Sequence, residues 1–296
     1  MSEATTSANA ALPEASRQPG GSKGVSERGF SWRTGLLGAH TALMYLFLFA
    51  PIVVLVAFSF TADPFGVAWN GFTLEWYTRL FNNTRLIDAT FNTLLVATIS
   101  TAIATLLGTL LALAMEHYRF RGRAATDVLL YLPIVIPEIV LAVALLSFFA
   151  FVFNALDALF GLRLRQGMLT VVLAHVTFSI AFVVVTVRTS LRGFDRRLEE
   201  AAMDLGANRW NTFRRITFPL ILPGIIGGAL LAFTLSLDDF IISLFVSGPG
   251  TLLLPVEVYN RVKRAVTPEI NAISTLMLLF SMVLVLLSQL AQRQRK

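Results

Sequence analysis

The sequence predicts an all-α integral membrane protein with six transmembrane helices, and three observations support this fold class. The 296 residues are 55% hydrophobic and only 14% charged, whereas a soluble domain carries about 25% charged residues. The mean hydropathy is +0.70, and the apolar residues stand in long blocks. Because a chain in lipid must satisfy its own backbone hydrogen bonds, and these blocks are too long for barrel strands, they are predicted as helices.

Six blocks reach the roughly 20 apolar residues that cross a bilayer. The third and fifth blocks contain acidic residues, but their flanking Leu, Val and Phe runs are too long for loops. The predicted spans lie at about 36–60, 91–115, 128–153, 168–187, 219–246 and 270–290.

The predicted domain organisation is a tail followed by one membrane domain. Residues 1–30 are rich in Ser, Ala, Gly and Glu and contain no apolar block, which is typical of a disordered segment. Residues 31–296 hold all six spans. We therefore expect a disordered cytoplasmic tail and a single transmembrane domain.

The placement of basic residues predicts the orientation. Of the 24 Lys and Arg residues, 17 fall in the tail, the second-to-third and fourth-to-fifth loops and the C-terminus, against seven in the other three loops. The positive-inside rule then places both termini in the cytoplasm. The net charge of +6 is explained without nucleic-acid binding, which needs a clustered basic face.

Reactive constellations are missing from the sequence. It contains no cysteine and three scattered histidines, which excludes disulfides and thiolate metal sites. A nucleophile elbow, a metal-ligand cluster and a phosphate-binding loop are also not found. We expect no enzyme activity, no metal and no cofactor in this chain.

The loop between spans four and five, at about 192–218, is the most informative segment. Asp195 as an N-cap and Gly206 as a left-handed residue after the last turn predict a short helix between them. Small side chains at Ala201 and Ala202, beside the carboxylate of Glu200, would let another protein approach closely. A solvated amphipathic loop is the alternative interpretation.

Three acidic residues, Glu138, Asp238 and Asp239, fall within the predicted spans. An acidic side chain at the bilayer centre costs about 2.5–3.5 kcal/mol on insertion scales. No Lys or Arg lies within the six predicted spans. We expect the negative charge of these side chains to be compensated by a proton, by water, by a basic residue of another subunit or by a cationic substrate. The alternative is that the acids form hydrogen bonds to Ser236, Ser243 or the backbone.

The positions of these acids lead to a pathway hypothesis. Asp238 is expected slightly beyond the midplane toward the exterior, and Asp239 about 100° from it around the helix. Glu138 is expected near the middle of the third span, where Pro133 and Pro137 can kink the helix. An extended cation with ammonium groups and methylenes would suit carboxylates set in apolar walls.

Two further side chains are ambiguous. The indole of Trp76, on an external segment, can attract an ammonium group at the entrance of a path or anchor the chain at the membrane interface. His175 in the fourth span is expected to be a packed, hydrogen-bonded side chain rather than a proton relay.

The loop resembles the EAA loop of the permease subunits of ABC importers. Glu200, Ala201 and Ala202 are followed after three residues by Gly206, and after nine more by Ile216, with Pro219 three residues further. Phe218 stands where leucine is usual. The resemblance implies that this loop is a coupling helix that sits in a cleft of an ATP-binding subunit.

The resemblance extends over about 30–292, and is specific to the spermidine/putrescine permease subfamily. The chain is similar to the second of its two permease types, and 199–207 resembles the putrescine system in particular. Glu138 stands where aspartate is also expected. The matching segments are 71–77, 118–122, 233–239, 247–250, 254–255 and 267–272.

The family implies a type I ABC importer permease (MetI-like) bundle that moves polyamines across the bacterial inner membrane. Expected partners are a homologous permease subunit, two ATPase subunits that carry ATP and Mg²⁺, and a periplasmic polyamine-binding protein. The implied pathway residues are Trp76, Glu138, Ser236, Asp238 and Asp239, and the implied coupling residues are Glu200, Ala201, Ala202, Gly206, Ile216 and Pro219.

The alternative function is a proton- or cation-coupled secondary transporter of organic cations that uses the membrane acids as its relay. We find no clear inverted repeat between the two halves of the sequence, which weakens this alternative.

Overall fold

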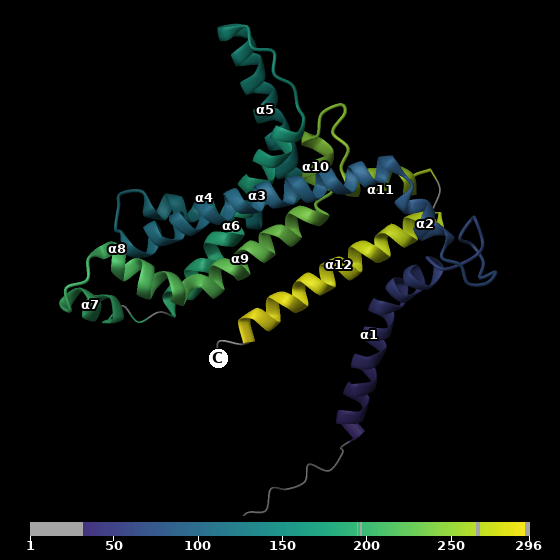
Figure 1. Cartoon of the computed structure of the whole chain (residues 1–296), viewed down its shortest axis with the longest axis horizontal. Helices are drawn as coiled ribbons and strands as arrows, with labels where there is room; N and C mark the ends of the chain where they lie inside the picture. Colours follow the sequence, from purple (N-terminus) through teal and green to yellow (C-terminus); the bar gives the residue numbers. More distant parts are fainter. Residues whose placement is uncertain (1–31, 194, 196, 265–266, 294–296) are drawn as a thin grey trace, which may run out of the picture. The chain divides into compact units, whose positions relative to one another are not determined.

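The computed structural model describes residues 32–193, 195, 197–264 and 267–293, and these residues are helical almost throughout (Figure 1). In these ranges the extended pairing consists of an isolated bridge between Thr61 and Phe72. The predicted all-α class is confirmed. The predicted tail, 1–30, lies outside the described residues.

Helix α1 (Trp32–Phe58) begins in the first of two compact units, which ends at Ile52, and its last six residues belong to the second unit. Its residues Gly35–Phe58 are long and apolar enough to cross a membrane, with Pro51 inside the helix. This matches the first predicted span.

The second unit, Val53–Lys296, contains the other elements. Its long helices are α3 (Thr84–His117), α5 (Glu138–Phe160), α6 (Met168–Arg192), α9 (Phe218–Asp238) and α12 (Pro268–Arg293). The short elements are α2 (Glu75–Phe81), α4 (Arg123–Val135), α7 (Arg197–Asp204), α8 (Arg209–Thr212), the π-helix η1 (Phe213–Thr217), α10 (Ile241–Val246) and α11 (Leu254–Val262). Within the described residues, six segments can cross a membrane by length and composition, as predicted.

Helices α3, α6 and α9 pack against one another and form the centre of this unit (Figure 1). Glycines permit this close packing. A Cβ atom added at Gly108 would lie 2.8 Å from Val183, and one at Gly224 would lie 2.0 Å from Ser190. Small residues commonly bring membrane helices together in this way. The core at this contact includes Ala104, Ala112, Val183, Val184, Val187, Ile221 and Ala232.

The third predicted span is interrupted, which corrects the sequence prediction. Helix α4 ends at Val135 and α5 begins at Glu138. Ile136 between them is extended, with φ −69° and ψ 135°, because the ring of Pro137 disfavours the helical conformation in the residue before it. Glu138 therefore lies at the start of a helix, and its predicted position in the middle of a span is wrong.

The fifth predicted span is also interrupted. Helix α9 ends at Asp238, and Asp239 is extended with ψ 116°. The Asp239 carboxylate accepts the backbone N–H groups of Ile242 at 3.4 Å and Ser243 at 2.8 Å. Because it satisfies N–H groups that begin a helix, it supports the start of α10.

Candidate functional site

The two helix breaks meet at a pair of carboxyl groups. Helices α5 and α10 are in contact, and the carboxyl groups of Glu138 at the start of α5 and Asp239 before α10 are close enough to interact electrostatically.

His175 on α6 lies against the carboxylate of Asp239. Its Nε2 lies 3.1 Å from Asp239 Oδ2, and the two residues are only 2% and 6% exposed. The Asp239 carboxylate also accepts the backbone N–H groups of Ile242 and Ser243, so the alternative of hydrogen bonds to the backbone is the one observed for this residue, and the contact with His175 is an addition that the sequence did not suggest. The expectation that His175 is packed and hydrogen-bonded is confirmed.

Ser236 lies on the other side of the same imidazole ring. Its Oγ is 2.6 Å from His175 Nδ1 and 3.0 Å from the hydroxyl of Ser100 on α3. Ser236 is buried. The structure thus connects Ser236 and Asp239 through His175, which the sequence did not link to either of them.

Asp238 is oriented differently from Asp239. It is the last residue of α9 and is exposed, whereas Asp239 is buried. The predicted divergence of these neighbours is therefore observed. Of the three acids in the predicted spans, Asp238 is exposed, Glu138 is half-buried and Asp239 is buried.

Trp76 belongs to a different part of the structure. It is 6% exposed on α2, and its Nε1 donates a hydrogen bond to the Thr61 carbonyl at 2.6 Å. The Arg79 guanidinium lies 4.9 Å from the centre of the indole ring. These contacts give Trp76 a packing role in this conformation, and its contact with an ammonium group stays a prediction.

The coupling loop folds much as its sequence predicts. Asp195 Oδ1 accepts the N–H of Arg197 at the start of α7. At the other end Gly206 adopts φ +87°, its N–H bonds to the Met203 carbonyl, and the N–H of Ala207 bonds to the Ala202 carbonyl. These two bonds form a Schellman motif, which explains the glycine.

One face of α7 is open. Glu200, Ala201 and Asp204 are exposed, and Leu205 after the helix is 90% exposed. An apolar side chain in this position, beside carboxylates, is suited to a protein partner. Ala202 is half-buried.

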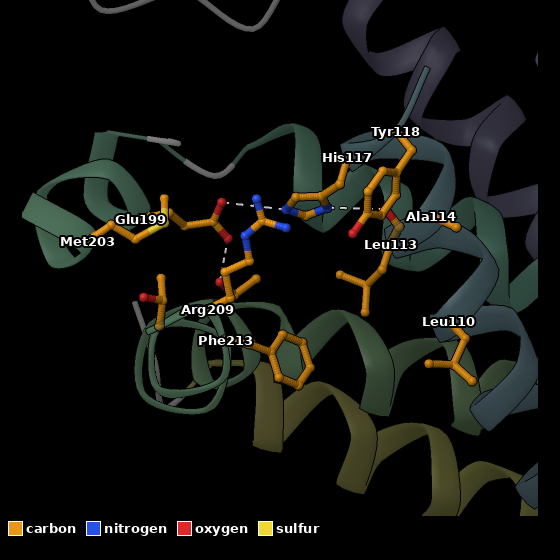
Figure 2. Close-up of a pocket in the computed structure, with 11 residues that line it drawn as sticks. Leu110, Leu113, Ala114, His117, Tyr118, Glu199, Met203, Arg209 and Phe213 are labelled. Atoms are coloured by element: carbon orange, nitrogen blue, oxygen red, sulfur yellow. Dashed lines mark hydrogen bonds and ion pairs between the residues drawn. The ribbon is translucent and has the colours of Figure 1, made fainter. Parts of the chain in front are cut away.

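Glu199 faces the opposite way, as Figure 2 shows. Its carboxylate lies 3.5 Å from His117 Nε2 at the end of α3 and accepts a hydrogen bond from the Thr217 hydroxyl in η1. These residues line a pocket of about 510 Å³ with Met203 and Phe213. Glu199 therefore connects the coupling helix to two parts of the membrane domain.

The loop enters the membrane domain through a π-helical turn. Ile216 lies in η1 and is half-buried, and Pro219 lies in the first turn of α9, where proline is tolerated. Short π-helical segments are frequent at functional sites.

Two buried ion-pair clusters were not found from the sequence. Arg188 is buried near the end of α6 and donates to Glu116 on α3 at 2.9 Å and to Asp127 on α4 at 2.5 Å. The partners are 72 and 61 residues away, so no local pattern reveals them. Helix α6 continues beyond the predicted span, which explains why Arg188 was placed in a loop.

The second cluster surrounds Glu257 on α11. This residue is 1% exposed and accepts hydrogen bonds from Arg85 and Arg261, each at 3.0 Å. Burial alone would raise the pKa of the Glu257 carboxyl, but the two guanidinium groups outweigh it and hold the pKa below the usual 4.5.

Comparison with known proteins identifies the family. Residues 104–294 match the binding-protein-dependent transport system inner membrane component family. The chain belongs to this family. Other members include the spermidine/putrescine transport system permease protein PotC of Haemophilus influenzae, which is 43% identical over 259 residues, covering 88% of this chain and 97% of that protein. The putrescine transport system permease protein PotI of Escherichia coli K12 is 41% identical over 248 residues, covering 83% and 85%.

A solved structure shows the same fold. A bacterial ABC transporter involved in the import of the acidic polysaccharide alginate contains a chain that matches with a TM-score of 0.74 at 21% identity, covering 89% of this chain and 96% of that chain. The type I ABC importer permease fold is therefore confirmed, and the family supports an importer subunit over a secondary transporter.

Proposed function

We propose that this chain is a permease subunit of an ATP-driven importer of polyamines, with putrescine and spermidine as the substrates to test first. The observation that carries the proposal is the exposed carboxylate of Asp238 beside the Glu138–Asp239 pair, in a chain at least 41% identical to permeases named for these amines. Ammonium groups need carboxylate partners, and the methylenes between them need apolar walls.

The proposed assembly contains a second, homologous permease, two ATPase subunits and a periplasmic binding protein. ATP and Mg²⁺ would be bound by the ATPase subunits. The exposed face of α7 supports this arrangement, because Leu205 has an apolar surface with no cover in the described part of this chain. We place the assembly in the bacterial inner membrane with both termini in the cytoplasm.

Transport would follow from a shift between two conformations. ATP-driven closure of the ATPase subunits would move α7, and Glu199 would pass this movement to α3 and η1 through His117 and Thr217. The path would then open alternately to the two sides of the membrane. The ATPase subunits must bind the two conformations with different affinities for this shift to occur.

The proposal is tested by amine uptake into proteoliposomes that contain the complete assembly. The D238N/D239N variant removes both charges while it keeps the side-chain size. We expect uptake to fall by at least about tenfold, because an ammonium group then meets no ionised carboxylate on α9. D157N is a matched control, since Asp157 lies near the exposed end of α5.

The possible results of this experiment distinguish a wrong function from a wrong choice of site residues. A wild-type assembly with no ATP-dependent uptake of either amine would contradict the proposed function. If the wild-type assembly takes up an amine and the D238N/D239N variant takes it up at the same rate, these two acids do not belong to the substrate path. Assembly of each variant with the ATPase subunits is checked by size-exclusion chromatography.

A further inference from the structure

Two aromatic rings lie beside the acids at the end of α9. The centre of the Phe240 ring, which directly follows Asp239 in the chain, is 4.5 Å from the centre of the Tyr259 ring on α11. Both side chains are half-buried, so each keeps some accessible surface. The end of α9 therefore combines the exposed carboxylate of Asp238 with an aromatic pair that begins two residues later.

Tyr259 belongs to a helix that is anchored on both sides of it. The N–H of Leu254, at the start of α11, donates to the Thr93 hydroxyl of α3 at 2.8 Å. Glu257, two residues before Tyr259, is buried and accepts hydrogen bonds from Arg85 of α3 and from Arg261. A ring on a helix held in this way can bind a ligand without first being ordered.

The Tyr259 ring already has an ammonium group against it. Lys263 Nζ lies 4.6 Å from the ring centre, within the distance of about 6 Å at which a ring attracts a cation. Residues four apart on a helix face the same side, so this contact is local. Because the Lys263 side chain is also exposed, another cation can displace its ammonium group from the ring.

The side chain of Lys263 has the chemistry of the amines proposed as substrates. It is an ammonium group on a flexible four-carbon stem, and putrescine is the same stem with an ammonium group at each end. Lys263 is the single lysine in the part of the chain that the structure describes. A ring that accepts this side chain is therefore suited to a primary alkylammonium ligand.

We propose that Tyr259, with Phe240 beside it, is a binding subsite for one ammonium group of the substrate, and that Lys263 occupies this subsite until the substrate displaces it. The ring takes one end of the amine and leaves the other ammonium group free to pair with Asp238. Lys263 is then a competitor built into the chain, which slows entry of the amine. This inference rests on the proposed function.

Substitutions at two positions separate the ring from its resident cation. Y259L removes the aromatic face and keeps an apolar side chain, whereas Y259F keeps the face and removes only the hydroxyl. K263M keeps an unbranched side chain and removes the ammonium group. R264M is the matched control for charge, because Arg264 is also exposed but its Nε donates to the Asn260 carbonyl.

The experiment measures ATP-dependent putrescine uptake by the complete assembly in proteoliposomes, with saturating loaded binding protein so that capture of the amine does not limit the rate. We expect Y259L to lower the rate by about two- to fivefold, and Y259F to leave it unchanged, because the attraction comes from the ring face. K263M should raise the rate by about two- to fivefold, while R264M should leave it unchanged. Opposite effects at positions 259 and 263 do not follow from a general loss of stability.

A wild-type rate in Y259L would overturn the inference, and so would equal losses in Y259L and Y259F, which would assign the effect to the hydroxyl. A K263M rate no higher than that of R264M would also overturn it, because the effect would then belong to net charge. If Y259L does not assemble, the comparison of K263M with R264M still decides. Failure of the proposed function has a different signature, since the wild-type assembly would then take up neither putrescine nor spermidine.

Discussion

Neighbouring acidic residues of this chain have opposite environments. Glu199 contacts the membrane domain while Glu200 is exposed, and Asp239 is buried while Asp238 is exposed. A rotation of about 100° per helical residue accounts for the first pair, and the end of α9 accounts for the second. The sequence predicts that such neighbours diverge. It does not predict which one is buried, because the partner of Asp239 is His175, 64 positions earlier in the chain.

The buried carboxylate of Glu257 leads to a prediction about pH. Its pKa is held below 4.5 in the folded chain, so its contribution to stability is complete above about pH 4.5 and is lost as the pH falls toward the folded value. We expect E257Q to lower the free energy of unfolding at pH 7 by on the order of 1–3 kcal/mol. The variant should also lose less stability than the wild type between pH 5 and pH 3.

Thermal unfolding of the purified subunit in detergent measures both effects. E75Q is the control, because Glu75 pairs with Arg79 on an exposed surface, where ion pairs contribute about 0–1 kcal/mol. An E257Q variant with the acid sensitivity of the wild type would show that this carboxyl does not titrate on acid unfolding.

At the level of elements, hydropathy predicts where the chain crosses the membrane but not where a helix stops. The blocks at 128–153 and 219–246 are long and mostly apolar despite their acidic residues, so both were predicted as continuous. Pro137 was a visible signal for the first break, since it restricts Ile136. The second break had no comparable signal, because it depends on hydrogen bonds between Asp239 and the start of α10.

Replacing Pro137 tests whether the first break positions Glu138. In P137A, residue 136 can become helical and α4 can continue into α5, which would rotate Glu138 away from Asp239. We expect amine uptake to fall at least about threefold because the carboxyl pair is disrupted. P133A is the control, since Pro133 lies inside α4 without a break. Equal uptake by P137A, P133A and the wild type would contradict a positioning role for the break.

The end of the coupling helix allows a second test at this level. Gly206 has φ +87°, where a β-branched residue is a genuine outlier. We expect G206V to disrupt the Schellman motif, to reduce uptake, and to reduce the stimulation of ATP hydrolysis by loaded binding protein. G193V is the matched control in the same loop, because Gly193 has an ordinary φ of −79°. Full stimulation in G206V would show that this cap is not needed for coupling.

For the whole molecule, composition and block length were enough to predict the class and the number of spans, and the family was predicted from the resemblance of the loop at about 192–218 and of further segments. The packing of α3, α6 and α9 was not predicted, because it depends on which glycine meets which side chain. Gly224, for example, faces Ser190 on a helix that precedes it by more than 30 residues. The pairing of Arg188 with Glu116 and Asp127 was missed for the same reason. Long-range contacts of this kind have no local signature.

The orientation of the chain rests on the distribution of its basic residues and can be tested directly. The sequence contains no cysteine, so single-cysteine variants need no prior substitutions. R119C lies in the exposed turn between α3 and α4, and R165C lies in the exposed segment between α5 and α6. Seventeen of 24 basic residues lie on the side that includes residue 119, and positive-inside placement therefore predicts a cytoplasmic R119C and a periplasmic R165C.

The test uses a membrane-impermeant maleimide on intact spheroplasts. We expect R165C to react before permeabilisation and R119C to react only after it, while the wild type, which has no thiol, stays unlabelled. His117, two residues before position 119, contacts Glu199 of α7, so the turn and the coupling helix lie on the same side. The reverse labelling pattern would therefore also place the coupling helix outside the cell. An ATPase could not reach it there, so this one labelling result constrains the mechanism as well as the topology.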